Sequence, residues 1–460
     1  MRYDLQEDTI AAIVTSSTNS GVSIIRVSGP DALEKVSPLI QSKTPTNLWK
    51  SHSIHYGYIV DNHKNPVDEV LILYMKGPKS YTREDVVEIH CHGGMVCCRE
   101  ILKIIFKQNI RPAEPGEFTK RAFLNGRIDL TQAEAVMDLI SAKNQYARMS
   151  GVTRLKGRMK DKVREIDHRI LDDVAFIEAG LDDPEHIDMS EFSQEFPSHL
   201  SDYMEQIQQM LDHYEEGRLI KEGIQTVILG RPNVGKSSFL NQLLGEDRAI
   251  VTDVPGTTRD MIEEDVMIQD VCLHIIDTAG IHETEDQVEK IGIERAKKSM
   301  EEADLCLLIL DQSSPLTKED LDLMDLIRDK KSLVLLNKND LDAKMTMEEI
   351  QKYWSSDILS VSSRTGLGVE AFGTHIRKMF HLDQLSFNEE IFIGNERQKT
   401  CLNEALEALS LVEEGIKNGV GEDFLSIDLI NAHENLKKLM GEQVDDELIE
   451  TIFSKFCMGK

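Results

Sequence analysis

The stretch Gly230-Arg231-Pro232-Asn233-Val234-Gly235-Lys236-Ser237 decides how the middle of the chain folds. It follows a short apolar run, Thr226–Leu229, and precedes a helical pattern that ends near Leu244. A buried strand, a glycine-bearing loop and a helix N-terminus in this order are the setting of a phosphate-binding loop. Backbone N–H groups and the positive end of the helix dipole both favour an anion there. We expect Lys236 to reach the β- and γ-phosphates of a nucleotide and Ser237 to bind Mg²⁺.

The length and composition of the chain limit its class. A chain of 460 residues is long enough for about three domains. Its N-terminus lacks the basic-then-apolar pattern of a signal peptide, and no apolar run has the length of a membrane span. The seven cysteines are scattered and odd in number, which is typical of reduced thiols. We therefore expect a cytoplasmic protein that makes no contact with a membrane.

The charge pattern has one local exception. The formal net charge of −29 argues against a general nucleic-acid coat, because phosphate backbones bind where positive charge is concentrated. From Lys143 to Arg169, however, nine Lys and Arg residues meet only Asp161, Glu165 and Asp167. Two interpretations are open for this basic strip: a solvated helix face or a docking strip for RNA.

The first hundred or so residues predict an α+β domain. A helical pattern covers Val96–Phe106, and turn signals separate several short runs rich in β-formers. Those runs are Ile10–Val14, Val22–Val27, His55–Val60, Val70–Met75 and Val86–His90. His90, Cys91 and His92, with Cys97 and Cys98 nearby, permit a metal site, but they lack the paired cysteine spacing of structural zinc. A strand followed by the Gly93-Gly94 turn is the favoured interpretation.

The rest of the chain predicts one domain inserted into another. Helix formers dominate from Phe118 to about Arg218 and return after Leu382. Between these two blocks, strands and helices alternate, which predicts a mostly parallel sheet with helices on both faces. Its apolar runs are Thr226–Leu229, Cys272–Ile276, Leu305–Leu310, Leu333–Leu336 and Ile358–Val361, and its helical patterns include Ile291–Met300, Leu321–Ile327 and Val369–Met379. The predicted domains are residues 1–118, residues 119–218, the inserted P-loop GTPase domain at 219–382, and a second helical part at 383–460.

Four further segments indicate that the nucleotide is GTP. Asp277-Thr278-Ala279-Gly280 ends a strand, where Asp277 can orient the Mg²⁺ shell and the Gly280 N–H can face the γ-phosphate. Asn337-Lys338-Asn339-Asp340 ends another strand, and a carboxylate at Asp340 can accept two N–H bonds from guanine that adenine cannot offer. Ser362-Ser363-Arg364 can present backbone N–H to guanine O6. Gly256–Asp260 lies where a switch loop would sit, with Thr258 placed to bind Mg²⁺.

The water-activating group is not the usual one. The position after Gly280 is Ile281, where Ras-type enzymes place a glutamine that orients water. Isoleucine cannot align a water, so Glu283 is the nearest candidate general base. The alternative interpretation is that Glu283 is an ordinary solvated carboxylate. The side-chain carbonyl of Asn233 can hold a monovalent cation near the phosphates, which would supply the charge that an arginine finger supplies elsewhere.

With these residues in view, the chain resembles the bacterial tRNA modification GTPases of the TrmE/MnmE family over essentially its full length. The terminal pentad and the Gly256–Asp260 loop are the most specific parts. The motifs that carry the resemblance are Arg26–Pro30, Tyr81–Asp85, His92–Gly94, Pro115–Phe118, Arg121–Gly126, Asp129-Leu130, Ala133–Ala135 and Phe456–Lys460. The resemblance implies an N-terminal domain that binds a tetrahydrofolate such as 5-formyltetrahydrofolate and forms a homodimer, a helical domain, and an inserted G domain.

The resemblance also implies an activity and partners. The family works with an FAD-dependent partner protein, in a heterotetramer, on C5 of the wobble uridine (U34) of certain tRNAs. It adds an aminomethyl-type group from a folate one-carbon unit, with glycine or ammonium as the amine, and GTP hydrolysis accompanies K⁺-dependent pairing of two G domains. By similarity, Asn233, Thr252, Val254 and Thr257 surround K⁺, Ser237 and Thr258 hold Mg²⁺, and Glu283 activates water.

Two sets of site residues follow. The expected GTP-binding residues are Asn233, Val234, Gly235, Lys236, Ser237, Ser238, Thr252, Asp253, Val254, Pro255, Gly256, Thr257, Thr258, Asp277, Thr278, Ala279, Gly280, Asn337, Lys338, Asn339, Asp340, Ser362, Ser363 and Arg364. For folate, the matching positions are Arg26, Glu84, Arg127 and Lys460. Arg127 stands where some relatives carry lysine, which keeps the charge but not the hydrogen-bond geometry.

Cys457 is a candidate nucleophile by its place in the terminal motif, although most lone cysteines are buried apolar groups. Asn395–Gln398 departs from the family pattern and receives no role.

Three functions are weighed. The first is a GTP-hydrolysing enzyme of tRNA wobble modification. The second is a GTPase switch in ribosome assembly, whose G-domain motifs would be the same. The third is a folate-binding one-carbon transferase with a G domain that takes no part in the chemistry. The motifs outside the G domain favour the first, because a ribosome-assembly switch does not need a folate site.

Overall fold

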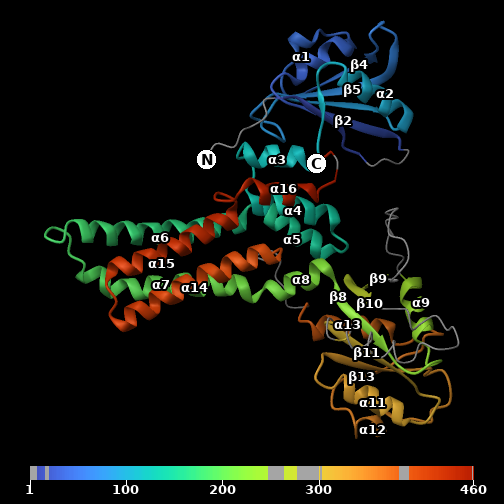
Figure 1. Cartoon of the computed structure of the whole chain (residues 1–460). Helices are drawn as coiled ribbons and strands as arrows, with labels where there is room; N and C mark the ends of the chain where they lie inside the picture. The colour runs from blue at the N-terminus through green and yellow to red at the C-terminus, as the bar shows by residue number, and fades with distance from the viewer. Residues whose placement is uncertain are drawn as a thin grey trace. The chain divides into compact units, whose positions relative to one another are not determined.

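The structure, a computed structural model, describes residues 8–15, 20–246, 264–276, 300, 303–382, 393–457 and 459–460 (Figure 1). The chain forms two compact units. The first comprises Met1–Met137, Arg154–Glu205 and Thr400–Lys460, and the second comprises Asp138–Thr153 and Gln206–Lys399. The second unit is thus inserted in the sequence of the first, and each has a hydrophobic core of its own.

A seven-stranded sheet forms the N-terminal part of the first unit. The strand order is β3-β4-β5-β6-β2-β1-β7, antiparallel except for the parallel pair β1–β7. The strands are β1 (Ile10–Ile13), β2 (Val22–Ser28), β3 (Ile40–Ser42), β4 (Ser53–Val60), β5 (Pro66–Met75), β6 (Val86–His92) and β7 (Arg111–Pro112). Two helices, α1 (Ala32–Val36) and α2 (Met95–Phe106), and two short 3₁₀ turns, η1 (Ser37–Leu39) and η2 (Thr46–Leu48), complete this part.

Alternation along the strands explains why this sheet has one buried face. In β5, Val70 and Ile72 are buried whereas Leu71 is exposed, since successive side chains point to opposite faces. The buried side packs against Ile101 and Ile105 of α2 in one core. Antiparallel sheets with one covered face typically show this pattern.

Helices make up the rest of the first unit and continue into the second. They are α3 (Glu117–Leu124), α4 (Leu130–Ser141), α5 (Gln145–Leu155), α6 (Arg158–Asp182), α7 (Ser190–Asp212), α14 (Glu396–Asn418), α15 (Glu422–Met440) and α16 (Asp446–Ser454). The core face of α6 consists of Met159, Val163, Ile166, Ile170, Val174 and Ile177, spaced three or four residues apart. A buried hydrogen bond of 2.6 Å between His433 Nδ1 and Asp167 Oδ1 also links α15 to α6.

A six-stranded sheet with helices on both faces forms the second unit. The order is β13-β12-β11-β8-β10-β9, and only the edge strand β9 runs antiparallel. The strands are β8 (Ile224–Leu229), β9 (Glu264–Ile268), β10 (Val271–Ile276), β11 (Leu305–Asp311), β12 (Ser332–Asn337) and β13 (Ile358–Ser360). The helices are α8 (Tyr214–Glu222), α9 (Lys236–Glu246), α11 (Lys318–Leu326), α12 (Met347–Ile350) and α13 (Val369–Met379).

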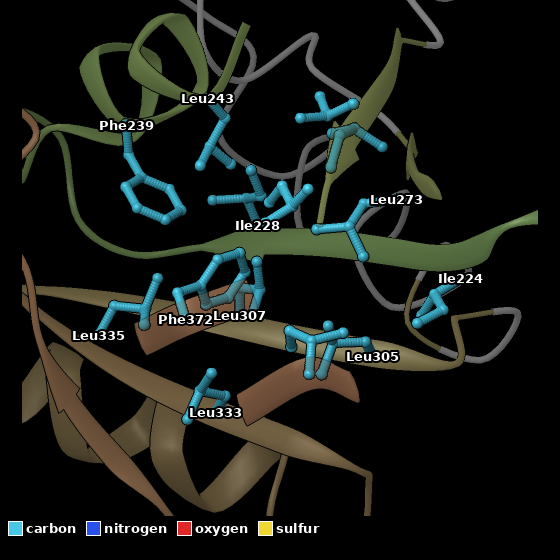
Figure 2. Packing of buried hydrophobic residues seen from close by; sticks show 14 of the residues in the cluster. Ile224, Ile228, Phe239, Leu243, Leu273, Leu305, Leu307, Leu333, Leu335 and Phe372 are labelled. Carbon is cyan, nitrogen blue, oxygen red and sulfur yellow. The ribbon is translucent and has the colours of Figure 1, made fainter. Parts of the chain in front are cut away.

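The central strand β11 shows why both faces are covered. Leu305, Leu307 and Ile309 point into one core with α9 and α13, while Leu308 and Leu310 point into the core that includes α11 and α12. Figure 2 shows the first of these cores, with Leu305 and Leu307 among the labelled side chains. Each fully buried leucine contributes about 1.5–3 kcal/mol. A parallel sheet buried in this way places the carboxyl ends of its strands at one common edge.

The predicted architecture is confirmed: an α+β N-terminal domain, a helical domain and an inserted α/β module of the P-loop GTPase type. The predicted strands all appear within a few residues of their expected bounds. Three strands were not predicted, namely β3, β7 and β9, because they are short or alternate polar with apolar residues at a sheet edge. Most of the predicted helix Ile291–Met300 lies outside the described residues.

Candidate functional site

The phosphate-binding loop connects β8 to the N-terminus of α9. Gly230, Asn233 and Gly235 all have positive φ, at +144°, +63° and +99°. A side chain at Gly230 would meet the carbonyl oxygen of Ile309 at 2.5 Å, so this glycine permits the close approach of β11. The loop therefore has the conformation that turns successive backbone N–H groups toward an anion at the helix N-terminus.

Lys236 lies across this loop. Its Nζ donates to the carbonyl oxygens of Gly230 at 2.7 Å and Arg231 at 2.8 Å. These two carbonyls hold the ammonium beside the start of α9. Lys236 therefore lies on the loop from which a lysine can reach nucleotide phosphates, as predicted.

The loop after β12 is tied directly to the phosphate-binding loop. Asn337 donates from Nδ2 to the carbonyl oxygen of Val234 at 2.9 Å, and Lys338 donates from Nζ to that of Asn233 at 2.9 Å. Asn337 Oδ1 accepts two bonds from Ser363, from its N–H at 3.0 Å and its hydroxyl at 2.9 Å. Three loops that are distant in sequence thus meet at the carboxyl edge of the sheet.

Asp340 is the carboxylate predicted to read the base. It is solvent-exposed, and its Oδ1 accepts a 2.7 Å hydrogen bond from the Ser362 hydroxyl. That bond, followed by Asp340's own backbone N–H, lowers the pKa of the carboxyl below its usual value. Asp340 is therefore ionised at neutral pH and available to accept N–H bonds. Asn339 lies beside it, held by a bond from its N–H to the Val361 carbonyl.

Some predicted GTP-site residues lie within the described part of the chain and others do not. Asn233 to Ser238, Asn337 to Asp340 and Ser362 to Arg364 are described, and they lie on the loops after β8, β12 and β13, at the start of α9 and at the end of β12. The residues outside the described part are Thr252, Asp253, Val254, Pro255, Gly256, Thr257, Thr258, Asp277, Thr278, Ala279, Gly280 and Glu283.

A second site lies between the N-terminal sheet and α3. The guanidinium carbons of Arg26 and Arg127 lie 5.0 and 4.4 Å from the centroid of the Tyr81 ring. Arg26 also lies 5.4 Å from the Phe118 ring and bonds Glu88 through Nε at 2.8 Å. Cation–π contacts of this kind orient both guanidinium planes on aromatic faces. Arg26 and Arg127, two of the predicted folate residues, therefore contact the same tyrosine ring.

The C-terminal segment reaches the same place. The backbone N–H of Phe118 donates to the carbonyl oxygen of Lys460 at 3.1 Å, and that of Gly116 donates to Cys457 at 3.4 Å. Lys460 therefore lies against the residue whose ring contacts Arg26. Cys457 is exposed, unlike most lone cysteines, and its role stays a prediction.

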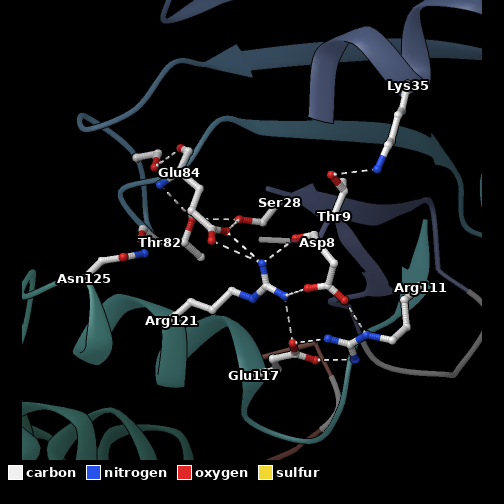
Figure 3. Close-up of polar contacts among 11 residues, drawn as sticks. Asp8, Thr9, Ser28, Lys35, Thr82, Glu84, Arg111, Glu117, Arg121 and Asn125 are labelled. Carbon is white, nitrogen blue, oxygen red and sulfur yellow. Dashed lines mark hydrogen bonds and ion pairs between the residues drawn. The ribbon is translucent and has the colours of Figure 1, made fainter. Parts of the chain in front are cut away.

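Glu84, the fourth predicted folate residue, is held by a buried arginine. Arg121, only 4% exposed, donates from Nη1 to Glu84 Oε1 at 3.1 Å and from Nη2 to Asp8 at 2.6 Å and Glu117 at 2.9 Å (Figure 3). Glu84 Oε2 also accepts the Ser28 hydroxyl at 2.7 Å. Both carboxylate oxygens of Glu84 are therefore fixed. Arg121 belongs to the motif Arg121–Gly126 but has no predicted role, and the local signal for this ion pair is its helical i,i+4 spacing to Glu117.

The charges in this network stabilise one another. Burial favours the neutral form of Glu117, but hydrogen bonds from Arg111, the Glu114 N–H and Arg121 outweigh it and lower the pKa of Glu117. Burial likewise opposes the charge on Arg121, and Glu84, Glu117 and Asp8 overcome it, so its pKa is raised. Glu117 and Arg121 therefore both carry their charge at neutral pH.

The basic strip from Lys143 to Arg169 is largely engaged by carboxylates. Its ion pairs include Lys143–Asp265, Lys160–Asp129, Lys162–Glu165, Arg164–Glu442 and Arg169–Asp202. Arg154, a further member, is 4% exposed. The structure favours the ion-paired helix face over the RNA-docking strip.

Two other motifs have structural roles. His92 and Cys97 both donate to the Asp68 carboxylate, at 2.7 and 3.2 Å, while Cys91 is buried. Among the described residues, no group of three or more His, Cys, Asp or Glu is arranged to hold a metal ion. Near α14, Asn395 Oδ1 accepts the Gln398 N–H at 2.9 Å and Gln398 Oε1 accepts the Gly394 N–H at 2.8 Å, which caps the helix.

The fold and the three converging loops define a P-loop GTPase module inserted into a helical protein. Comparison with known proteins gives the family. The model of the MnmE helical domain matches residues 130–457, and that of the GTP-binding protein TrmE N-terminus matches residues 9–127. The tRNA modification GTPase MnmE of Lachnoclostridium phytofermentans is 48% identical over 459 residues, which cover 99% of this chain and 100% of that one. The tRNA modification GTPase MnmE of Lactobacillus gasseri is 46% identical over 99% of both chains.

The chain belongs to the MnmE family of tRNA modification GTPases. The resemblance seen in the sequence is thereby confirmed, and so is the prediction of a GTPase that takes part in tRNA modification. Among solved structures, a variant of Aquifex aeolicus Era bound to GDP and AlF₄⁻ is 28% identical, with 40% of this chain and 66% of that chain covered and a TM-score of 0.28. The fold assignment depends on the sheet and loops described above and not on this partial likeness. None of the helices in the described residues has the length and hydropathy of a membrane span.

Proposed function

We propose that this protein is the GTP-hydrolysing subunit of a complex that modifies C5 of the wobble uridine, U34, in tRNA. The complex would add an aminomethyl or carboxymethylaminomethyl group from a folate one-carbon unit, together with an FAD-dependent partner protein. We propose a homodimer formed through the N-terminal domain and a heterotetramer with that partner in the cytoplasm. The domains would span residues 1–118, 119–218, 219–382 and 383–460.

One set of contacts carries this proposal: Arg26 and Arg127 lie against the Tyr81 ring, Lys460 lies against Phe118, and Arg121, on the same helix as Phe118, holds Glu84. A reduced folate has an aromatic ring, a glutamate tail with carboxylates and a pterin edge with N–H donors. Arg26, Arg127 and the Lys460 ammonium offer charge to the carboxylates. Glu84, held by Arg121 and Ser28, offers an oriented carboxylate to the pterin N–H groups. A GTPase without one-carbon chemistry would have no use for this set.

In the G domain, the residues divide the work of hydrolysis. The backbone of the phosphate-binding loop and Lys236 would bind the β- and γ-phosphates. Ser237 and Thr258 would hold Mg²⁺, and Asn233, Thr252, Val254 and Thr257 would hold K⁺. The loop supports this assignment, since Gly230, Asn233 and Gly235 have positive φ and Asn233 is exposed just before the helix start. The cations supply positive charge to the leaving phosphate when bound.

Glu283 would act as the general base that takes a proton from the attacking water. Asp340, with its lowered pKa, would select guanine because both N1–H and the 2-amino group can donate to its carboxylate. Pairing of two G domains in K⁺ would complete each site.

Binding of 5-formyltetrahydrofolate to the purified protein tests the folate site. Isothermal titration should detect binding that Arg127→Ala and Glu84→Gln each weaken about tenfold or more, as expected for a lost charge-assisted hydrogen bond. Arg99→Ala is the matched control, because Arg99 is an exposed arginine on α2 of the same domain. The absence of folate binding by the unaltered protein would contradict the proposal. Mass analysis of wobble nucleosides from cells that lack the protein tests the modification itself, which should disappear.

A further inference from the structure

The helices α6, α7, α14 and α15 share an end that the GTP and folate sites do not use. Figure 1 shows the α6–α7 connection and the α14–α15 connection at the same end of these helices. A hollow of about 140 Å³ opens there. The apolar residues that line it include Ile177, Phe192, Phe196, Ile416, Val420 and Leu425. They come from all four helices and the α14–α15 connection, so the hollow is a feature of the assembled bundle end.

Exposed apolar side chains lie on the helices that form this hollow. Phe176 contacts Phe192 in a tilted arrangement with ring centroids 4.8 Å apart, and Phe192 stacks on Phe196 at 5.0 Å. Phe176 is 39% exposed, while Phe424 and Ile427, one turn apart on α15, are 60% and 55% exposed. Phe176 continues the apolar surface of the hollow through its contact with Phe192, and Phe424 and Ile427 add exposed apolar groups on α15. Exposed apolar groups on the elements that form an apolar hollow mark a surface on which a partner docks. We call this set, with the hollow, the bundle-end patch.

The charge around the bundle-end patch is almost entirely negative. From Ile170 to Leu200 the sequence has nine Asp and Glu and no Lys or Arg. From Thr400 to Asn431 it has seven Asp and Glu and a single cation, Lys417, which pairs with Glu413 at 3.0 Å. This field repels the phosphate backbone of RNA. It also opposes self-association through the patch, because two copies would bring like charges together.

We propose that the bundle-end patch docks a protein partner through a segment that presents apolar side chains flanked by Lys and Arg. An aromatic or leucine side chain of that segment would fill the hollow, and its cations would face the acidic rim. This is the usual division between an apolar anchor and a charged rim in a protein interface. The inference rests on the proposed function in one respect, since it takes the FAD-dependent protein of the modification complex as the partner.

The test measures binding of the purified FAD-dependent partner to the full-length protein by biolayer interferometry. The double variant Phe424→Ser/Ile427→Ser removes two exposed apolar groups, and Glu178→Lys/Asp182→Lys reverses charge at the end of α6. Val96→Ser is the matched control, because Val96 is 85% exposed on α2 of the same unit. The apolar variant should bind the partner at least tenfold more weakly, and the charge variant should bind more weakly with a reduced dependence on salt. The control should bind as the unaltered protein does, and basal GTP hydrolysis should be equal in all four proteins.

The outcomes separate the inference from the function on which it rests. If the unaltered protein binds the partner and both bundle-end variants bind it equally well, the docking inference is overturned while the proposed complex stands. If the unaltered protein does not bind the partner, the proposed complex fails and the inference fails with it. Loss of self-association, or loss of tRNA binding, in the apolar variant without loss of partner binding would assign the patch to another occupant and also overturn the inference.

Discussion

The side-chain amide of Asn337 donates to the backbone carbonyl of Val234 at 2.9 Å, so the loop predicted to read the base holds the loop predicted to bind the phosphates. The same Asn337 accepts two bonds from Ser363 through its other amide atom. It is buried, at 1% exposure, and its bond to Val234 joins residues 103 positions apart in sequence. Asn337 therefore acts as the joint between three nucleotide-binding loops.

Replacing Asn337 with alanine should weaken GTP binding. The change leaves the Val234 carbonyl and the Ser363 donors without their partner, and each lost buried bond costs about 1–3 kcal/mol. We expect the Kd for a fluorescent GTP analogue to rise by about 10–100-fold. Asp342→Ala, on the exposed turn just after this loop, is the control and should leave the Kd unchanged. An equal Kd for Asn337→Ala would show that the loops hold their positions without the joint.

Changing Asp340 to asparagine should alter the choice of base. The amide offers an N–H donor where the carboxylate accepts, and it therefore suits the C2 carbonyl of xanthine better than the 2-amino group of guanine. GTP affinity should fall by about 10²-fold or more, as for other sites that lose a specific donor–acceptor match. Affinity for XTP should rise in the same competition assay. A variant that kept its preference for GTP would remove Asp340 from this role.

Hydrolysis should depend on the monovalent cation through Asn233. We expect the unaltered protein to hydrolyse GTP faster in K⁺ than in Na⁺ at equal ionic strength, since a cation of matching size would place charge at the leaving phosphate. In Asn233→Ala the two rates should become equal. The measurement is release of inorganic phosphate. Indifference of the unaltered protein to the cation would disprove the assignment.

Removal of the Glu283 carboxylate should affect chemistry and spare binding. In Glu283→Ala, the hydrolysis rate should fall by about 10²-fold or more, the effect of losing a positioned general base. The Kd for GTP should stay nearly constant, because the group acts on water. Glu285→Ala removes a nearby carboxylate and serves as the control. If both variants hydrolyse GTP at the normal rate, the base lies elsewhere.

The buried network around Arg121 should make the first unit sensitive to acid. The pKa of Glu117 is lowered in the folded protein, so its stabilisation is present above the unfolded value of 4.5 and is lost as the pH falls through the folded pKa. Glu117→Gln should therefore lower the free energy of unfolding at pH 7 by about 1–3 kcal/mol. The difference from the unaltered protein should shrink below pH 4.

Calorimetry of the thermal transition at several pH values would follow this difference. Glu114→Gln is the control, since Glu114 is exposed and its side chain lies outside the network. A Glu117→Gln deficit that stays constant from pH 7 to pH 3 would mean that lost packing, and not lost charge, causes it.

Local patterns in the sequence predicted the strands and the nucleotide loops. They did not predict the contacts between residues distant in the sequence. The run Leu305–Leu310 is apolar at every position because both faces of β11 are covered, and such a run is visible without a structure. The motif at the end of β12 predicted a loop that reads guanine, but nothing in the motif indicated that Asn337 would bond to Val234. That contact exists only once the sheet brings the two strand ends to one edge.

The same distinction applies to the second site. Arg26, Glu84 and Arg127 were named by resemblance alone, whereas their common neighbour Tyr81 emerges from the fold. Arg121 was overlooked because its partners Asp8 and Glu84 are distant in sequence. Pro197 is a further difference between local rules and the structure. Proline usually interrupts a helix, but α7 continues through it from Ser190 to Asp212.

The backbone of Gly235, at φ +99°, passes so close to Asn337 that a β-carbon there would collide with the amide nitrogen. Neither position can therefore change freely in the course of evolution. A mutation of the glycine would displace the asparagine, and a larger residue in place of the asparagine would press on the glycine. A side chain at position 235 would therefore disturb both loops at once, because it would displace Asn337 and strain a backbone that only glycine adopts readily.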